Sequence, residues 1–470
     1  MKNWYTKKLA AYAVKTRFED YPEDVVGQVK LLLLDSLGCM FGGTQTALGG
    51  AIVAPLKSMG GQPEASIIGA GQKVPTIQAA FANGTTANAL DYDDTLLGIG
   101  HPGASVIPAA LAMAEWRRAS GKALLNAILV GYDVGDRIGL AIQPSYERLQ
   151  KVWGVGTWQT LGAAAAAAKV LDLDLNQTLN AYGVAGATAP LPNTQKWGWD
   201  LSERPIHWVK EPTGWPSWTG STAAVLARNG FVGNRYILDG ENGFWIMAGS
   251  DRCDFEKMTR GLGSEFEVNN IAIKPYSSCR WQHAALDAVN NLKISHRLQP
   301  DDIQDIAVHS FAWVKTHEVY NPVDMVDAQF SIPYTVAMVL LGLHPGPAWY
   351  AAETMNSKAV ADIMAKVHVA VDPRIDRAYF EDDRISARVV FTTTSGDVFE
   401  KLVDVPSGDP KNPVSREFVI EKFKNQARYV LDAEQVDRVV EYVDKLETLD
   451  DINAFTALLS QWDGDLQKTA

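Results

Sequence analysis

The chain has 470 residues, of which 47% are apolar and 21% are charged, a balance typical of a folded globular protein. It is too long for one ordinary core, so we expect two domains and a protein large enough to be an enzyme. The net charge of -12 argues against a nucleic-acid binder, because neutralising phosphates requires a clustered excess of Lys and Arg.

The N-terminal residues indicate no targeting segment. Met1 to Lys8 are polar and precede no hydrophobic signal region, so neither a secretory signal nor a membrane anchor is expected. The apolar run Val29 to Phe41 is interrupted by Asp35 and is too short to span a bilayer, which predicts a buried helix. The three cysteines form no C-x-x-C pair and no complete disulfide framework, so a reducing cytoplasm is the simplest location.

The first part of the chain, Asn3 to about Phe266, is predicted to be helical. Its apolar residues recur three and four apart, between Gly and Pro residues that end one helix and begin the next. The alanine-rich segment Leu161 to Leu171 favours a buried helix whose small side chains let neighbouring helices approach closely.

Between about Ile271 and Val405, β-rich runs alternate with helical ones. Strands are predicted over 303–313, 366–371, 385–393 and 398–405, with a hairpin turn at 395–397, and helices over 331–342 and 358–366. Helices then return over 416–429, 433–447 and on to 462. Because such helices have no place on a small mixed domain, we expect them to pack on the first domain. The predicted fold is mainly α, with a large discontinuous helical domain (1–268 and 408–470) and a smaller inserted α+β domain (269–407).

The densest polar cluster holds Asp91, Asp93 and Asp94, and His101 follows in a glycine-rich loop. Three carboxylates within four residues repel one another, and one reason to gather them is to orient and tune a base. His101 is the candidate base, because imidazole titrates near neutral pH. The alternative is that Asp93 or Asp94 caps the next element and His101 lies on the surface. Magnesium-dependent prenyl chemistry is a weaker alternative, because it needs D-D-x-x-D and a second acidic motif, and both are missing.

Two further stretches supply positive charge. Lys210 lies just ahead of a helix rich in small residues, where the helix dipole would help it to bind a carboxylate, although a solvated lysine is equally compatible. Lys274, Arg280 and His283 fall within ten residues at the predicted domain join and could pair with more than one carboxylate. Cys279, which lies between them, is expected to be buried and inert.

The usual nucleotide-binding and serine-hydrolase motifs are missing from the sequence. There is no G-x-G-x-x-G after a strand, no G-x-x-x-x-G-K-[ST] and no G-x-S-x-G. We therefore expect neither a cofactor nor a metal.

In combination and in order, these stretches resemble the MmgE/PrpD family, which includes 2-methylcitrate dehydratases, cis-aconitate decarboxylases and iminodisuccinate epimerase. The resemblance covers almost the whole chain. It rests on residues 34–39, 83–84, 89–95, 101–103, 106–110, 156–158, 161–164, 274–276, 279–280 and 283.

The resemblance implies a helical domain with an inserted α+β lid, usually in a homodimer. Carried over by position, the active-site residues are Asp91, Thr95, His101, Lys210 and Lys274, with Tyr320 as the lid tyrosine.

The chain departs from the family pattern in three places, one of which is the Lys210 region, where Trp215 and Trp218 are extra tryptophans. Trp153 stands where many members have a histidine before the G-T-W stretch, and Asn88 replaces the histidine often found three residues before the first aspartate. These changes predict a more aromatic and less basic pocket. A smaller or partly apolar acid is then expected in place of a tricarboxylate such as methylcitrate.

We therefore predict a cofactor-independent lyase of a small hydroxy di- or tricarboxylic acid. His101, held by Asp91, is expected to remove a proton next to a carboxylate, while Lys210 and Lys274 bind carboxylates and stabilise the developing charge. Further contacts with the substrate or the leaving group are expected from Thr95, Trp153, Arg280, His283 and Tyr320.

Three outcomes of this chemistry are open. Dehydration comes first, by analogy with the family, and epimerisation and decarboxylation are alternatives. A catalytically inactive dimeric ligand-binding protein is the alternative of another class, and it is suggested by Trp153 in place of a histidine.

Overall fold

The computed structural model describes residues 4–194 and 213–461, and its fold is mainly α, as predicted. The helices of the first part of the chain are α1 (Tyr5–Lys15), α2 (Glu23–Thr44), α3 (Ala47–Met59), α4 (Thr76–Asn88), α5 (Gly103–Arg117), α6 (Gly121–Ala141), α7 (Tyr146–Leu149), α8 (Val155–Trp158), α9 (Thr160–Val170), α10 (Leu175–Thr188), α11 (Gly214–Arg228) and α12 (Phe244–Met247). Two short antiparallel pairs accompany them, β1 (Ala65–Ile67) with β2 (Gln72–Val74) and β3 (Val152–Trp153) with β4 (Asn193–Thr194).

Small residues allow the central helices to approach closely. The alanine-rich segment forms α9, which is buried against α5, α6 and α11. A Cβ added to Gly162 of α9 would lie 2.8 Å from the carbonyl oxygen of Gly131 in α6, so only glycine fits this contact. The predicted close approach of neighbouring helices is therefore confirmed.

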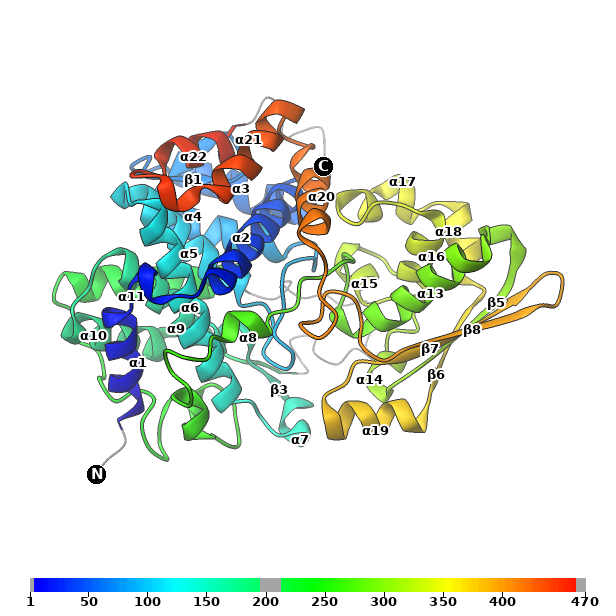
Figure 1. Ribbon diagram of the computed structural model, residues 1–470, viewed down its shortest axis with the longest axis horizontal. Coiled ribbons are helices and arrows are strands. Elements are labelled where there is room, and N and C mark those ends of the chain that lie inside the picture. Colours follow the sequence, from blue (N-terminus) through cyan, green and yellow to red (C-terminus); the bar gives the residue numbers. More distant parts are fainter. Residues whose placement is uncertain (1–3, 195–212, 462–470) are drawn as a thin grey trace.

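Helix α2 contains the apolar run interrupted by Asp35. It is long and apolar enough to cross a membrane by length and composition, but 72% of its most apolar window is buried inside the protein. Its hydrophobic residues share one core with α5, α6 and the C-terminal helices α20 (Arg416–Ala427), α21 (Ala433–Asp444) and α22 (Asn453–Leu459). Figure 1 shows α20 beside α2, although the two helices lie near opposite ends of the sequence.

The segment between these helical stretches has a hydrophobic core of its own and lies on the right in Figure 1. Its helices are α13 (His283–His296), α14 (Ala312–Lys315), α15 (Met325–Gln329), α16 (Ile332–Leu341), α17 (Ala352–Met355), α18 (Lys358–Met364) and α19 (Pro373–Asp382). Its strands are β5 (Ile303–Ser310), β6 (Val367–Val371), β7 (Ala387–Thr393) and β8 (Val398–Val403).

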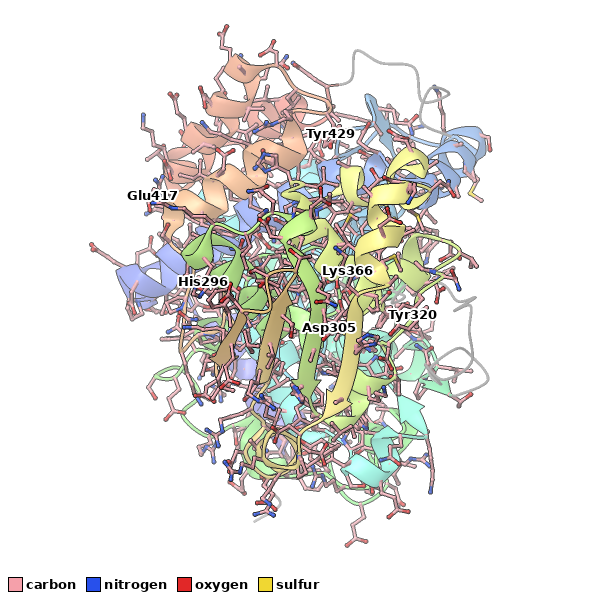
Figure 2. All side chains as sticks on the ribbon, turned by 90° about the vertical axis from the view of Figure 1, so that its right-hand side faces the viewer. His296, Asp305, Tyr320, Lys366, Glu417 and Tyr429 are labelled. Atoms are coloured by element: carbon pink, nitrogen blue, oxygen red, sulfur yellow. The ribbon has the colours of Figure 1, made fainter. Side chains whose placement is uncertain are left out.

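The four strands form one mixed sheet in the order β6-β5-β7-β8. Strands β5 and β6 are parallel, and the other pairs are antiparallel. In β7, buried residues alternate with partly exposed ones, as expected for a sheet covered on one face, here by α13 and α16. Figure 2 views the opposite face of this sheet.

The sequence predicted these strands to within a few residues, except at the end of β5. There Phe311 interrupts the strand and α14 follows, so the predicted strand over 303–313 is three residues too long. The hairpin turn is confirmed, because Gly396 has a φ of 90° and the amide of Thr393 donates to Asp397. Helices α13, α15, α17 and α19 were not predicted.

The chain crosses twice between the two hydrophobic cores, and the two crossings contact each other. The amide of Ile273 donates to the carbonyl of Gly408 at 2.9 Å. The Asp287 carboxylate accepts hydrogen bonds from the Tyr276 hydroxyl and from the amide of Ser407, at 2.9 and 2.6 Å. Residues 273–287 and 406–408 are therefore held together where the chain passes between the two cores.

Candidate active site

The site is built on the loop that follows helix α4. Asp91 has a φ of 49°, an unusual left-handed conformation for a residue other than glycine, and strained conformations of this kind gather at functional sites. The carbonyls of four consecutive residues in this loop accept side-chain hydrogen bonds, namely Ala89 from Gln329, Leu90 from Ser277, Asp91 from Lys274 and Tyr92 from Lys422. Carbonyls beyond a helix end lack helical partners, so donors from distant segments fix the loop.

Asp94 faces the next helix. It accepts from the amide of Gly103 at 2.9 Å, at the start of α5, and from the hydroxyl of Tyr132. Burial, together with the charges of Asp93 and Asp35, raises the pKa of the Asp94 carboxyl to about 7, although both hydrogen bonds oppose the shift. The capping role considered for this aspartate is therefore confirmed, but the surface location considered for His101 is wrong, because His101 is 8% exposed.

His101 lies between the two remaining aspartates. Its Nδ1 is 3.1 Å from Asp93 Oδ2, and its Nε2 is 3.6 Å from Asp91 Oδ1, which is too long for a hydrogen bond. Asn88 donates to the other oxygen of Asp93 at 2.9 Å. Both aspartates therefore lie within ion-pair distance of His101; Asp93 is the closer partner, and Asn88 in turn orients Asp93.

Asp91 lies closest to Lys274. The ammonium donates to Asp91 Oδ1 at 2.6 Å and to the Asp91 carbonyl at 2.9 Å, and both side chains are buried. The sequence predicted that Asp91, His101 and Lys274 lie close together, and the structure places them within ion-pair distance of one another through Asp91. The sequence missed this pairing because it carries no information on which carboxylate faces which cation.

The electrostatics of Asp93 agree with this geometry. Burial alone would raise the pKa of its carboxyl, but the charge of His101 at ion-pair distance and the more distant charge of Lys274 outweigh burial. The pKa of Asp93 therefore lies below its usual value. The carboxylate is ionised at neutral pH and can stabilise a protonated His101.

A cavity opens over His101 and joins the two cores. Its walls consist of residues 95–98, Asp91, Gly100, His101, Trp153, Lys274, Cys279, Arg280, Trp281 and Phe330. The lining combines the polar groups of His101, Lys274 and Arg280 with the aromatic rings of Trp153, Trp281 and Phe330. Thr95 lines the cavity as predicted, but its hydroxyl donates to the carbonyl of Gly100 at 2.8 Å.

Arg280 lines the cavity, and His283 lies behind it. The guanidinium donates to the carbonyl of Ser407 at 2.7 Å and lies 3.2 Å from His283 Nδ1, while His283 Nε2 is 3.2 Å from the carbonyl of Ser278. Burial and the charge of Arg280 hold the pKa of His283 well below its usual value, so this ring is neutral. His283 is not among the cavity-lining residues and orients Arg280 instead of contacting the cavity.

The predicted lid tyrosine lies elsewhere. Tyr320 is 38% exposed, and its hydroxyl donates to the carbonyl of Val367. Figure 2 shows Tyr320 beside β6, at the edge of the sheet. It is therefore not among the described residues that line the cavity. Lys210 falls outside the described residues.

Asp91, Asp93 and His101 offer ligand atoms that all lie within 4.8 Å of one another, a spacing that a metal ion could use. However, the Lys274 ammonium is 2.6 Å from Asp91 and would repel a cation bound there. This donor set therefore fits an ion-paired proton-transfer site better than a metal site.

The sequence analysis missed two contributors, Trp281 and Phe330, because aromatic residues are common in cores and only the fold turns these two toward a cavity. It also missed Lys422, which donates to the carbonyl of Tyr92. The signal for Lys422 is its position on the buried stripe of α20, between Val419 and Phe423.

Comparisons with known proteins identify the family of this chain. Residues 7–255 match the model of the MmgE/PrpD N-terminal domain, and residues 276–448 match that of the C-terminal domain. The chain is 27% identical to the cis-aconitate decarboxylase of Homo sapiens, over 93% of this chain and 90% of that protein. It is 25% identical to the cis-aconitate decarboxylase of Aspergillus terreus, over 98% and 96% of the two chains. It is 24% identical to an alkylcitrate dehydratase of a fungal species, over 93% and 91%. Because the two family models match most of its length, the chain belongs to the MmgE/PrpD family.

Proposed function

We propose that the protein is a cofactor-independent lyase in which His101 transfers a proton at a carbon next to a carboxylate of a small di- or tricarboxylic acid. The observation that carries the proposal is the arrangement around His101. An imidazole with an ionised carboxylate 3.1 Å from Nδ1 lines a cavity that also presents Lys274 and Arg280.

The arrangement leaves Nε2 for the reaction. A proton on Nδ1 faces Asp93, so the lone pair of Nε2 is turned toward Asp91 and the cavity. In this tautomer His101 can take a proton as a general base, and the charge of Asp93 stabilises the imidazolium that results. The same imidazolium can give a proton to a carbon in the reverse direction.

Carboxylate recognition falls to the cations. Asp91 accepts from two of the three Lys274 donors, and the remaining donor can meet a ligand carboxylate. Burial lowers the pKa of Arg280 to about 10, which still leaves the guanidinium charged at neutral pH. These cations would stabilise the charge that develops on the substrate. Lys210 remains a proposed third cation.

Decarboxylation is our first candidate reaction. The bond from carbon to a carboxylate breaks, its electron pair shifts through an adjacent double bond, and His101 gives a proton to the carbon at the far end. This route needs one proton donor, and relatives from human and Aspergillus terreus are cis-aconitate decarboxylases. A water-excluding aromatic wall such as that of Trp153 and Trp281 suits the loss of CO2 from a carboxylate.

Dehydration is the second candidate and is supported by the alkylcitrate dehydratase relative. It requires an acid for the leaving hydroxyl in addition to the base. The Thr95 hydroxyl already donates its hydrogen bond to the carbonyl of Gly100, and Tyr320 lies outside the described cavity lining. These two groups are therefore poorly suited to protonate a leaving hydroxyl. Epimerisation remains an outcome of the test, as does an inactive ligand-binding protein.

The experiment is a product analysis by NMR with cis-aconitate, citrate, methylcitrate and smaller unsaturated diacids. We expect loss of CO2 from an unsaturated acid, abolished in His101→Ala and retained in His296→Ala. His296 is the matched control because it lies in the last turn of α13, against Phe399 and away from the cavity lining. No turnover and no proton exchange with any of these acids would favour the binding protein.

The remaining expectations are proposals at the same level. We propose a homodimer in the cytoplasm, and domains of residues 1–268 with 408–470 and of residues 269–407. The second domain would act as a lid that excludes water from the cavity. A smaller or partly apolar acid is favoured by the aromatic wall.

A further inference from the structure

Lys422 is a buried lysine that does not line the cavity. Its ammonium lies 2.6 Å from Asp35 Oδ1 and donates to the carbonyls of Tyr92 and Lys274, at 2.6 and 2.9 Å. It also lies 3.9 Å from the centre of the Tyr92 ring. The ammonium therefore makes two backbone hydrogen bonds and one ion pair, with three segments that are distant in sequence.

We propose that Lys422 is a positioning residue, whose ammonium holds the backbone on both sides of the proton-transfer site and so sets the distances among His101, its carboxylates and Lys274. The inference rests on the proposed function for its kinetic consequence. Its geometric consequence can be tested without a substrate.

The two carbonyls explain this role. The Tyr92 carbonyl belongs to the peptide plane that leads into Asp93, whose carboxylate lies 3.1 Å from His101. The Lys274 carbonyl belongs to the residue whose own ammonium binds Asp91. One buried cation therefore restrains the backbone of both acid-base pairs.

Stability alone does not account for the pair of Lys422 and Asp35. Both side chains are at most 1% exposed, and removing two charges from water costs about as much as their attraction returns. Hydrophobic replacements of such pairs are often neutral. The Lys422 ammonium also donates hydrogen bonds to two carbonyls beside the site, which an apolar side chain in its place could not do.

The C-terminal segment gains a role by the same argument. Lys422 lies on α20, the first helix after the second crossing between the two cores, and Asp35 lies on α2. The approach of these helices is close, since a Cβ added to Gly38 would lie 3.1 Å from the Cα of Phe423. The C-terminal helices thus do more than cover the core.

The test compares Lys422→Met with the double variant Lys422→Met/Asp35→Asn. The single variant leaves a buried carboxylate without its cation, so its melting temperature should fall strongly. The double variant removes that charge and should recover most of the melting temperature. A positioning role predicts that the double variant still has a kcat at least about tenfold below that of the wild type, with KM changed by less than about threefold.

A matched control lies two residues further along the same helix. Lys424 pairs with Asp437 at 2.6 Å but is partly exposed, so Lys424→Met/Asp437→Asn should leave both kcat and the melting temperature unchanged.

A second readout needs no substrate. Histidine NMR, with the His101 signal identified by its loss in His101→Gln, reports the Nδ1–H tautomer. We expect a changed or mixed tautomer in the Lys422→Met/Asp35→Asn protein.

The inference is overturned if the stable double variant keeps both the wild-type kcat and the wild-type His101 signal. If the wild type turns over no acid, the proposed function fails, and the His101 signal alone decides whether Lys422 positions the site.

Discussion

Replacing Asp93 by Asn should disable the site while leaving the fold intact. The carboxylate lies 3.1 Å from His101 Nδ1, and the substitution removes its charge while keeping its shape and its contact with Asn88. A polar contact with a charged group contributes about 1.5–3 kcal/mol. Because about 1.4 kcal/mol corresponds to a factor of ten, the loss predicts a rate about 10- to 150-fold lower. An Asn amide that donates to Nδ1 would also favour the wrong tautomer and add to the loss.

The assay is the initial rate with the acid that the wild type turns over, combined with urea unfolding. Asp94→Asn is the matched control, because its carboxylate faces Gly103 and Tyr132 instead of His101. We expect the control to retain most of the activity. An Asp93→Asn protein that is folded and reacts at the rate of the wild type would refute the assignment of Asp93 as the partner of His101.

Three further predictions follow from the same geometry. The pKa of Asp94 is raised to about 7 in the folded protein, whereas the unfolded chain releases this proton near pH 4. The protonated Asp94 therefore contributes to stability at low pH, and the contribution is lost as pH rises through 7. Between pH 5 and 7 the unfolding free energy of the wild type should therefore fall by about 2–3 kcal/mol relative to Asp94→Asn, measured by urea titration at each pH. Gly103→Ala would bring a Cβ within 2.6 Å of both Asp94 carboxylate oxygens, and it should lower the unfolding free energy by about 1–3 kcal/mol; an unchanged urea midpoint would contradict this. Trp153→His should raise the ratio of kcat/KM for polar tricarboxylates to kcat/KM for partly apolar acids by about tenfold. An unchanged ratio would show that Trp153 does not determine substrate specificity.

Much of the fold follows from local patterns. The alternation in residues 387–393 and the glycine at 396 predicted the β7–β8 hairpin, because the strand period and the turn conformation are local properties. The predicted strand β5 is too long because the apolar residues after Ser310 suit a strand as well as a short buried helix. The sequence pattern did not predict helix α19, because this segment is mostly polar and only Ile375 and Tyr379 are buried.

The polar centre of the site was predictable from the sequence, but its pairings and its aromatic lining were not. Asp91, His101 and Lys274 were identified from residue type and resemblance, yet the choice of Asp93 as the partner of His101 depends on the left-handed turn at Asp91. Asp35 was visible as a break in an apolar run, and Lys422 lies on a buried helix face. Only the packing of α2 against α20 joins these two anomalies into an ion pair.

The central claim is that His101 moves a proton at the carbon next to a substrate carboxylate, and the most direct measurement is deuterium incorporation during turnover in D2O. The wild type should place one deuterium at that carbon of the product, and folded His101→Ala should place none above the uncatalysed rate. Incorporation by His101→Ala at the rate of the wild type would contradict the account, whatever product the enzyme forms.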